Sequence, residues 1–411
     1  MTDVDLFDPD TSDCPYNAYA TLRAEAPAWR EPRTGMWVIT RYDDIKAIVT
    51  DVERFPSSRD RGKIDPRAKR IKAIYEDKGW VPAATLAGRD DPNHRQMRKL
   101  FDHAFRPARI AELDGYITDL AHRLIDVFID TGRCDWVRQF AVPLPLIVIG
   151  KQMGAPEEDI WQIKAWTDAW VQRLGVMQTE EEMVWSTEQE IEAQHYFQPI
   201  FERLRREPDD TLLSDLVNTE IPEWGRPLTD NELHAEMTAD TFVGGSETTT
   251  NALSEGARLL AAHPEAWAKV TADPDRYVPL LAEEVLRIES PVQGLFRSTA
   301  VDVELGGVSI PAGSILNIRW GSANRDESRF ECPEQFDLDR PNVRQHLAFG
   351  FGTHHCLGAP LARRELTIGF RALGDRVEDL SFVHGANDFR HHPNFVLRAL
   401  KHLHLNVTPR P

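Results

Sequence analysis

The stretch from Phe349 to Glu365 reads FGFGTHHCLGAPLARRE, and it sets the interpretation of the rest of the chain. Gly350 and Gly352 permit a tight backbone turn, and a helical pattern begins just after Cys356. A thiol at the start of a helix meets backbone N–H groups and the positive end of the helix dipole, both of which favour the thiolate. The stretch therefore predicts a preformed, soft anionic ligand for iron.

Two other interpretations of Cys356 stay open at this point. A lone cysteine is more often a small buried residue than a ligand. A zinc site would use His354, His355 and Cys356 together, but consecutive residues rarely converge on one ion, and no partner pair follows at finger-like spacing. The rest of the chain has to decide between these interpretations.

The composition excludes several classes of protein. The chain has 411 residues, 66 acidic against 48 basic side chains, a formal net charge of −18 and 41% hydrophobic residues. This apolar fraction is enough for a large core, and such an acidic surface repels nucleic acid and anionic lipid, so we expect neither as a partner. The four cysteines show no pairing pattern, and we find no signal peptide and no apolar run near the roughly 20 residues of a membrane span. We expect a cytoplasmic protein.

Helical periodicity covers about residues 92–289 and 357–375. Thr229 and Glu232 have capping-box spacing, and no proline follows before His263. This pattern predicts one helix of over 30 residues that crosses the whole core. A second helix is predicted to begin after Asp273, with Pro274 at its first position.

Strand signals are short and lie mainly in three parts of the chain, at about residues 36–60, 298–320 and 380–409. Gly306-Gly307 predicts a tight hairpin turn, and Phe395–Leu397 is predicted to be a strand. No linker separates the halves of the chain. We therefore expect a mainly α fold with small β-sheet regions (α+β), in a single domain that spans residues 1–411.

The pattern Phe349-x-x-Gly352-x-x-x-Cys356-x-Gly358 resembles the heme-binding signature of the cytochromes P450. The resemblance implies the cytochrome P450 fold, with a long central helix over heme b (iron protoporphyrin IX). It also implies that Cys356 is the axial ligand of the heme iron and that Phe349 contacts the cofactor.

Two more elements carry the same resemblance. Glu284-x-x-Arg287 is similar to the family's Glu-x-x-Arg element, and Arg340 matches the arginine that completes its charge cluster. Glu284 and Arg287 are one helical turn apart, so they can pair. The resemblance implies that all three form a buried network that holds the loop around the cysteine.

The segment from Val243 to Thr249 resembles the family's oxygen-binding segment. Its two mid-helix glycines cost about 1 kcal/mol each relative to alanine, which the close approach of a flat cofactor and dioxygen would explain. The resemblance implies that Gly244 contacts the cofactor and that Glu247 and Thr248 deliver protons during oxygen activation. Without the resemblance, the Thr248 hydroxyl has a simpler explanation, since a hydroxyl in a helix can donate to a preceding backbone carbonyl.

Heme brings two propionates, which need paired donors inside a protein. The resemblance assigns this role to His94, Arg98, Arg297 and His354, all of which are present. His355 has no assigned role, and we expect it at the surface.

The residues that the family places over the heme are mostly apolar, which favours a small, mostly apolar organic substrate such as a terpenoid, steroid, fatty acid or aromatic compound. The candidate pocket residues are Asp240, Val243, Gln293, Leu295, Phe395 and Val396. Asp240, Gly244 and Thr248 share a helix face, so the Asp240 carboxylate could bond a substrate hydroxyl or amine. Pairing with an arginine is an equally good account of Asp240.

The implied activity is heme-thiolate monooxygenation, in which one atom of O2 enters a C–H bond. The chain has no length to spare for a reductase domain, so the resemblance implies electrons from NAD(P)H through a separate reductase and a 2Fe–2S or similar ferredoxin. Arg363 and Arg364 are candidates for contact with this acidic partner, and we expect a monomer. Two alternatives stay open: a peroxygenase driven by hydrogen peroxide, which usually lacks the acid and alcohol pair, and a non-catalytic heme-binding sensor.

Overall fold

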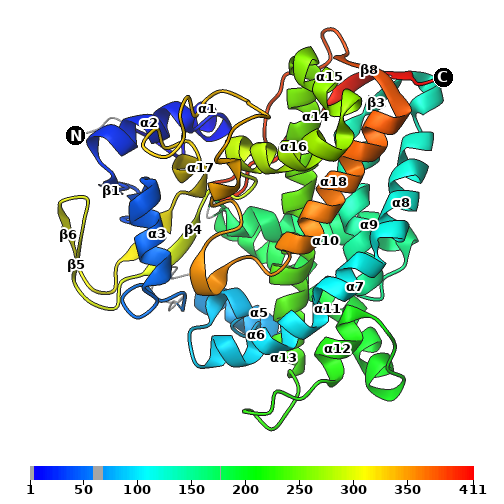
Figure 1. The fold of residues 1–411 in the computed structure, drawn as a ribbon. Helices are drawn as coiled ribbons and strands as arrows, with labels where there is room; N and C mark the ends of the chain where they lie inside the picture. The colour runs from blue at the N-terminus through cyan, green and yellow to red at the C-terminus, as the bar shows by residue number, and fades with distance from the viewer. Residues whose placement is uncertain (1–3, 59–67, 176) are drawn as a thin grey trace. The chain divides into compact units, whose positions relative to one another are not determined.

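The computed structural model describes residues 4–58, 68–175 and 177–411 (Figure 1). The chain divides into two compact units. The first unit comprises Met1–Phe55, Ala111–Pro145 and Glu247–Pro411, and the second comprises Pro56–Ile110 and Leu146–Ser246. Most elements are helices and the sheets are small, which confirms the predicted fold class. The single domain predicted for residues 1–411 stays a prediction. Within the described residues, no helix is both long enough and apolar enough to cross a membrane.

The first unit contains the sheets. Its strands are β1 (Ala28–Arg30), β2 (Trp37–Ile39), β3 (Arg133–Asp135), β4 (Leu295–Ser298), β5 (Val303–Leu305), β6 (Val308–Ile310), β7 (Ile315–Ile318), β8 (Val377–Phe382) and β9 (His404–Pro409). Its helices are α1 (Pro9–Asp13), α2 (Tyr16–Glu25), α3 (Tyr42–Thr50), α8 (Asp114–Asp126), α14 (Thr248–Ala262), α15 (Pro264–Ala272), α16 (Pro274–Glu289), α17 (Trp320–Ala323) and α18 (Ala359–Arg376). Shorter helical turns are η2 (Ile129–Thr131), η3 (Val137–Ala141), η6 (Val343–Gln345) and η7 (Gly352–His354).

The second unit is helical in its described residues. Its elements are α5 (Ala68–Lys78), η1 (Leu86–Gly88), α6 (Asn93–Ala104), η4 (Glu157–Asp159), α10 (Ile160–Leu174), α11 (Glu180–Arg206), α12 (Leu212–Asn218) and α13 (Asp230–Ala235). Three elements contain a boundary between the units: α7 (Pro107–Glu112), α9 (Pro143–Gln152) and η5 (Glu236–Glu247).

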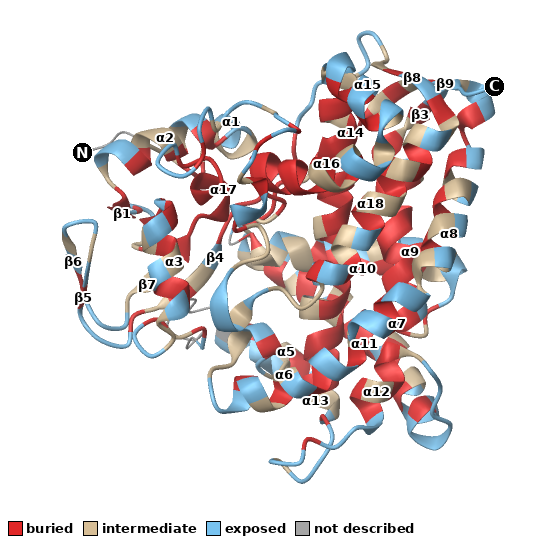
Figure 2. Ribbon diagram, in the orientation of Figure 1, coloured by how far each residue is buried: buried red, intermediate tan, exposed pale blue. Residues whose placement is uncertain are grey.

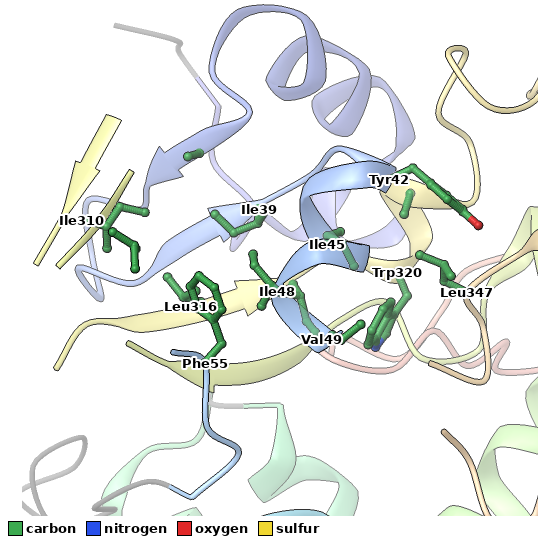
Figure 3. Close-up of a cluster of buried hydrophobic side chains, with 14 of the residues drawn as sticks. Ile39, Tyr42, Ile45, Ile48, Val49, Phe55, Ile310, Leu316, Trp320 and Leu347 are labelled. Atoms are coloured by element: carbon green, nitrogen blue, oxygen red, sulfur yellow. The ribbon is translucent and has the colours of Figure 1, made fainter. Parts of the chain in front are cut away.

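The largest sheet has the order β1-β2-β7-β4, in which β2 and β7 are parallel and the other neighbours antiparallel. Beside it, α3 presents Tyr42, Ile45, Ile48 and Val49 on one face, and these side chains join a buried cluster with the strand residue Leu316 (Figure 3). The face forms because apolar residues recur at spacings of three and four along the helix. This cluster fixes α3, whose last turn supports the loop described below.

The long helical segment predicted from Thr229 is present as α13, η5 and α14 in succession. The Thr229 hydroxyl accepts the Glu232 N–H, and the Glu232 carboxylate accepts the Thr229 N–H, so the predicted capping box is confirmed. No pattern in the sequence predicts that η5 is wound as a π-helix. In the first unit α14 is buried over most of its length (Figure 2) and packs against α16 and α18.

Two further local predictions are confirmed. The Asp273 carboxylate caps α16 by accepting the Arg276 N–H at 3.3 Å, with Pro274 at the first helical position. Gly306 and Gly307 join β5 to β6 with φ values of 56° and 77°, the left-handed conformation that a tight hairpin turn needs.

The strand predicted at Phe395–Leu397 is wrong. Only one isolated bridge forms there, between Val292 and Leu397. The physical reason is local, because the Asn394 side chain accepts the N–H groups of Val396 at 2.8 Å and Leu397 at 2.9 Å. Those donors are then not available to a strand ladder. The strand-rich part predicted at residues 36–60 is also wrong over most of its described length: only Trp37–Ile39 forms a strand, and Tyr42–Thr50 forms α3, because its apolar residues recur at helical spacing. Residues 59 and 60 lie outside the described residues.

Candidate functional site

The Cys356 loop, residues 349–358, folds back on itself in the first unit. The Cys356 N–H donates to the Phe349 carbonyl at 2.8 Å, and Gly350 and Gly352 both have left-handed φ values, 69° and 73°. These glycines are the sequence feature that permits the turn. The loop leaves Cys356 half-buried, three residues before α18 begins at Ala359.

A second reason for glycine at position 352 is that the loop packs closely on the end of α3. A Cβ at this position would come within 3.0 Å of the Val49 carbonyl oxygen. Any larger residue would push the loop away from the apolar cluster that holds α3. The position of Cys356 therefore depends on the core of the first unit as well as on local turn chemistry.

Glu284, Arg287 and Arg340 are brought together behind this loop. The Glu284 carboxylate accepts two hydrogen bonds from Arg287, at 2.7 and 2.8 Å, and one from Arg340 at 3.3 Å. The side chains of Glu284 and Arg287 are fully buried. A bidentate pair of this kind fixes direction as well as charge.

The remaining donors of these arginines bind the long loop between α17 and the Cys356 loop. Arg287 donates to the carbonyls of Asn324 at 3.0 Å and Pro333 at 2.8 Å. Arg340 donates to the carbonyls of Glu331 at 2.6 Å and Gln335 at 2.9 Å. The network therefore orders a segment that has almost no regular secondary structure of its own.

A second buried carboxylate, which sequence reasoning missed, connects α16 to the residues on both sides of the Cys356 loop. Glu283 accepts from Arg363 at 2.6 and 3.2 Å and from Nε2 of His346 at 2.9 Å. Nδ1 of His346 accepts the Ala348 N–H at 3.1 Å, so Nε2 is the nitrogen that carries the hydrogen. Burial opposes ionisation, but the hydrogen bonds from His346 and Arg363 outweigh it and hold the pKa of Glu283 at about 2.

The two arginines proposed for partner contact both have partners within the chain. The Arg363 guanidinium lies 4.5 Å from the centre of the Phe349 ring as well as on Glu283. Arg364 forms an ion pair with Asp114 on α8. Their side chains are 39% and 46% exposed, so each also presents surface to solvent.

The proposed propionate ligands occur in both units. In the first unit, Arg297 lies on β4, is 7% exposed and donates to the Phe296 carbonyl at 2.8 Å, while half-buried His354 ends η7. In the second unit, His94 and Arg98 are one turn apart on α6, and Arg98 also pairs with Asp102 at 2.8 Å. Burial, and then the Arg98 charge, lowers the pKa of His94. His355 is exposed, as predicted.

These residues fit a heme. A thiol on an ordered loop matches the ligand that the iron takes, and buried arginine and histidine side chains match the charge of two propionates. Gly244 adds an independent sign, because it is exposed in the middle of a helical segment and a Cβ there would meet no atom within 4 Å. At Gly245, by contrast, a Cβ would come within 3.2 Å of Ile149, so this glycine is explained by packing alone.

The acid and alcohol predicted to deliver protons, Glu247 and Thr248, lie where η5 passes into α14. Glu247 is 5% exposed and Thr248 is half-buried. The neighbouring hydroxyls are committed to carbonyls, since Ser246 donates to Phe242 at 2.7 Å and Thr250 donates to Ala141 at 2.9 Å. A π-helical turn at such a point is typical of functional sites.

Glu365 is another residue that sequence reasoning missed. It lies on α18, is 1% exposed, and burial raises its pKa to about 8, an effect that the Thr249 hydroxyl on α14 opposes. The side chain is therefore a neutral acid at pH 7. The sequence indicates the burial of Glu365 in one way only: the apolar pattern of the helix predicts a buried residue at this position, and the residue there is a glutamate.

Asp240 has a structural contact in the second unit. Its carboxylate accepts the Ala87 N–H at 3.1 Å, and Glu236, one turn earlier, accepts the Leu86 N–H at 2.6 Å. Both acids therefore hold η1. Burial, and then the Asp240 charge, raises the pKa of Glu236 well above its ordinary value.

The other candidate pocket residues differ in exposure. Leu295 is 38% exposed, whereas Val243, Phe395 and Val396 are buried. The Phe395 ring stacks on Phe7 at 4.5 Å and lies 3.7 Å from the Arg319 guanidinium. The Gln293 amide donates to the carbonyls of Glu289 at 3.0 Å and Ser290 at 2.7 Å, which caps α16. Substrate contact by these residues stays a prediction.

Known proteins resemble this chain throughout its length. The Cytochrome P450 family model matches residues 176–373. The polyketide biosynthesis cytochrome P450 PksS of Bacillus subtilis (strain 168) is 35% identical, over 98% of this chain and 99% of its own. The structure of cytochrome P450 CREJ in complex with (4-ethylphenyl) dihydrogen phosphate has a TM-score of 0.89 at 32% identity and covers 99% of both chains.

P450BioI, solved in complex with hexadec-9Z-enoic acid ligated acyl carrier protein, has a TM-score of 0.86 at 29% identity, over 97% of this chain and 99% of its own. These neighbours confirm the predicted fold. Given a relative at 35% identity over almost the entire length of both proteins, the chain belongs to the cytochrome P450 family.

Proposed function

We propose that the protein inserts one atom of O2 into a C–H bond of a small, mostly apolar organic substrate. The observation that carries the proposal is the Cys356 loop, whose Cys356 N–H bonds the Phe349 carbonyl and leaves the thiol half-buried, while Glu283 binds the flanking residues His346 and Arg363. A bound heme supplies iron whose thiolate ligand favours cleavage of the O–O bond. Cys356 would hold the iron, and Arg297, His354, His94 and Arg98 would hold the propionates.

Glu247 and Thr248 have the proton-delivery role. The Glu247 carboxyl brings an acid into the buried part of the segment, and the Thr248 hydroxyl can accept a proton and pass one on. The presence of both residues argues against the peroxygenase and the sensor, neither of which needs them. A reduced, CO-bound absorption band typical of thiolate-ligated heme, together with turnover by ferredoxin but not by peroxide alone, distinguishes the three functions.

The test of this role is Thr248→Ala. We expect it to uncouple NAD(P)H consumption from product and to release hydrogen peroxide, with product per electron pair falling about tenfold, since one positioned proton donor contributes at least that much. The matched control is Thr250→Ala, whose hydroxyl is bound to the Ala141 carbonyl and should leave coupling unchanged. Equal coupling in Thr248→Ala and wild type would remove Thr248 from the mechanism.

The proposal includes electron supply by a separate NAD(P)H-dependent reductase and a 2Fe–2S or similar ferredoxin. Arg364 is the better of the two candidate contacts, because Arg363 also holds Glu283 and its loss would disturb the Cys356 loop. We expect Arg364→Glu to slow reduction by ferredoxin several-fold at low salt and much less at high salt. Reduction by dithionite should not change.

The control for this experiment is Arg390→Glu, which replaces an ion-paired arginine of similar exposure, 50% against 46%. It should leave the rate with ferredoxin unchanged. An unchanged rate in Arg364→Glu as well would reject this docking site.

The substrate class rests on the apolar character of the candidate pocket residues. It is supported by the relatives, whose names and ligands include polyketide biosynthesis, an ethylphenyl phosphate and a carrier-bound C16 fatty acid. A screen for heme spin-state shifts with terpenoids, steroids, fatty acids and small aromatics would identify the class. A low-spin heme with all four would contradict the proposed classes.

A further inference from the structure

A cluster of metal-ligating side chains lies on the β3–β9 pair and contains no residue of the proposed active site. Asp135 ends β3, and antiparallel pairing places it opposite His404, the first residue of β9. His402 comes two residues earlier. Leu403 and Leu405 are fully buried, so His402 and His404 share the opposite face with Asp135.

The three side chains already converge. One ligand atom from each lies within 4.8 Å of the other two. Nδ1 of His402 is 3.2 Å from Oδ2 of Asp135, and the two imidazole rings stack at 6.0 Å with an 11° angle between their planes. A tetrahedral ion with bonds of about 2.0–2.1 Å separates its ligand atoms by roughly 3.3 Å, so one edge of the site has the required length.

The backbone that carries these ligands is fixed. The Asp135 N–H donates to Gln139 at 2.8 Å, and the Trp136 N–H donates to the Leu403 carbonyl at 2.8 Å. Asn387 bonds both backbone groups of His404, at 2.7 and 2.9 Å. Binding of an ion would therefore require rotation of the side chains and no change in the strand pairing.

We propose that Asp135, His402 and His404 bind a divalent transition-metal ion, of which Zn²⁺ is the best match. Two imidazole nitrogens and one carboxylate oxygen suit zinc, whereas calcium and magnesium require mainly oxygen ligands. The His402 side chain is 64% exposed, so water can fill the remaining position. The ion clamps the end of β3 to the start of β9, segments 267 residues apart in sequence, and so stabilises the sheet β3-β9-β8.

The test is zinc binding by the heme-loaded protein after chelator treatment, measured by competition with a chromogenic zinc indicator. We expect one ion per chain, and at least about tenfold weaker binding in His402→Ala, His404→Ala and Asp135→Asn, since even losses outside the ligand shell reduce metal affinity by that factor. His402 is largely exposed, so His402→Ala separates loss of the ligand from loss of the fold.

The control is His103→Ala, which removes an exposed histidine of α6 and should leave zinc affinity unchanged. Thermal unfolding gives a second measurement, because zinc should raise the midpoint of the wild type and of His103→Ala but not that of His402→Ala. The proposal is overturned if the wild type binds no stoichiometric zinc, or if His402→Ala and His404→Ala bind it as tightly as the wild type does. Neither result depends on whether the protein is a monooxygenase.

Discussion

On α16 of the first unit, Glu283 and Glu284 are adjacent and almost fully buried, and arginine guanidinium groups donate to both carboxylates. On η5 of the second unit, Glu236 and Asp240 are one turn apart, and backbone N–H groups of η1 donate to both. The pKa of Glu283 is held at about 2, whereas burial and the Asp240 charge raise the pKa of Glu236 well above its ordinary value.

The difference concerns what balances the charge. A guanidinium supplies both hydrogen bonds and an opposite charge, and for Glu283 these lower the pKa of the carboxyl. A backbone N–H supplies a hydrogen bond without a full charge, so two neighbouring acids compete for ionisation. The structure around Cys356 is therefore built to stay fixed, while the contact between η5 and η1 is sensitive to protonation.

The largest expected effect comes from Glu284→Gln, which removes one of the two carboxylates on α16 that bind arginine. This change leaves Arg287 and Arg340 buried without their carboxylate, for which a cost of about 3–5 kcal/mol in the free energy of unfolding is expected. The loop that they order should loosen, and a large fraction of the chains should fail to retain heme. Urea unfolding and the heme absorbance per chain measure the two effects.

An exposed ion pair of the same segment provides the control. Lys269 and Asp339 pair at 2.6 Å with side chains 44% and 41% exposed. Lys269→Gln should change the free energy of unfolding by less than about 1 kcal/mol and leave heme content unchanged. If Glu284→Gln and Lys269→Gln change the free energy of unfolding equally, the buried Glu284 network stabilises the fold no more than an exposed ion pair does.

Glu365 is an exception that sharpens the comparison, since it lies in the first unit without an arginine and has a pKa of about 8. The folded chain keeps a proton that the unfolded chain releases above about pH 4.5, so this stabilisation is complete below that pH and is lost as the pH rises to about 8. The slope is roughly 1.4 kcal/mol per pH unit, or about 2–3 kcal/mol between pH 5 and 7.

Glu365→Gln should remove this slope, because an amide stays neutral at every pH. The measurement is the free energy of unfolding of both proteins across that pH range, and the control is Glu378→Gln, which alters an exposed carboxyl on β8. If wild type and Glu365→Gln show the same pH dependence, the Glu365 carboxyl is ionised in the folded chain, and the comparison between the two regions loses its exception.

The sequence predicted what depends on a few neighbouring residues. The caps at Thr229 and Asp273 and the Gly306-Gly307 turn were all predicted correctly, because their hydrogen bonds or dihedral angles are set within about four residues. The spacing of residues around Cys356 predicted the family, and with it the fold and the monooxygenase class.

What the sequence did not predict depends on distant contacts. Glu283 meets Arg363 across 80 positions of sequence, and the buried site of Glu365 is created by packing against α14. The π-helical winding of η5 has no pattern of its own in the sequence. The error at Phe395–Leu397 arose because Asn394 took the N–H groups that a strand would have used. The roles of individual site residues, and the cytoplasmic location and monomeric state, stay predictions.

The smallest expected effect concerns Glu236 and Asp240 on η5. Asp240→Asn removes the charge beside Glu236 but keeps an oxygen that can accept the Ala87 N–H. Because the Asp240 charge is one cause of the raised pKa of Glu236, that pKa should fall toward its ordinary value. The free energy of unfolding at neutral pH should change by less than about 1 kcal/mol, since the hydrogen bond is retained.

The same variant decides whether Asp240 also anchors a substrate. A carboxylate that binds a ligand amine should lose about tenfold in affinity for amine-bearing ligands on conversion to the amide, equivalent to about 1.4 kcal/mol, while affinity for neutral apolar ligands stays the same. Spin-state titration of both kinds of ligand measures this directly. If neither affinity changes, the role of Asp240 is to hold η1, and the two regions then differ in how they fix the backbone and not in whether they bind substrate.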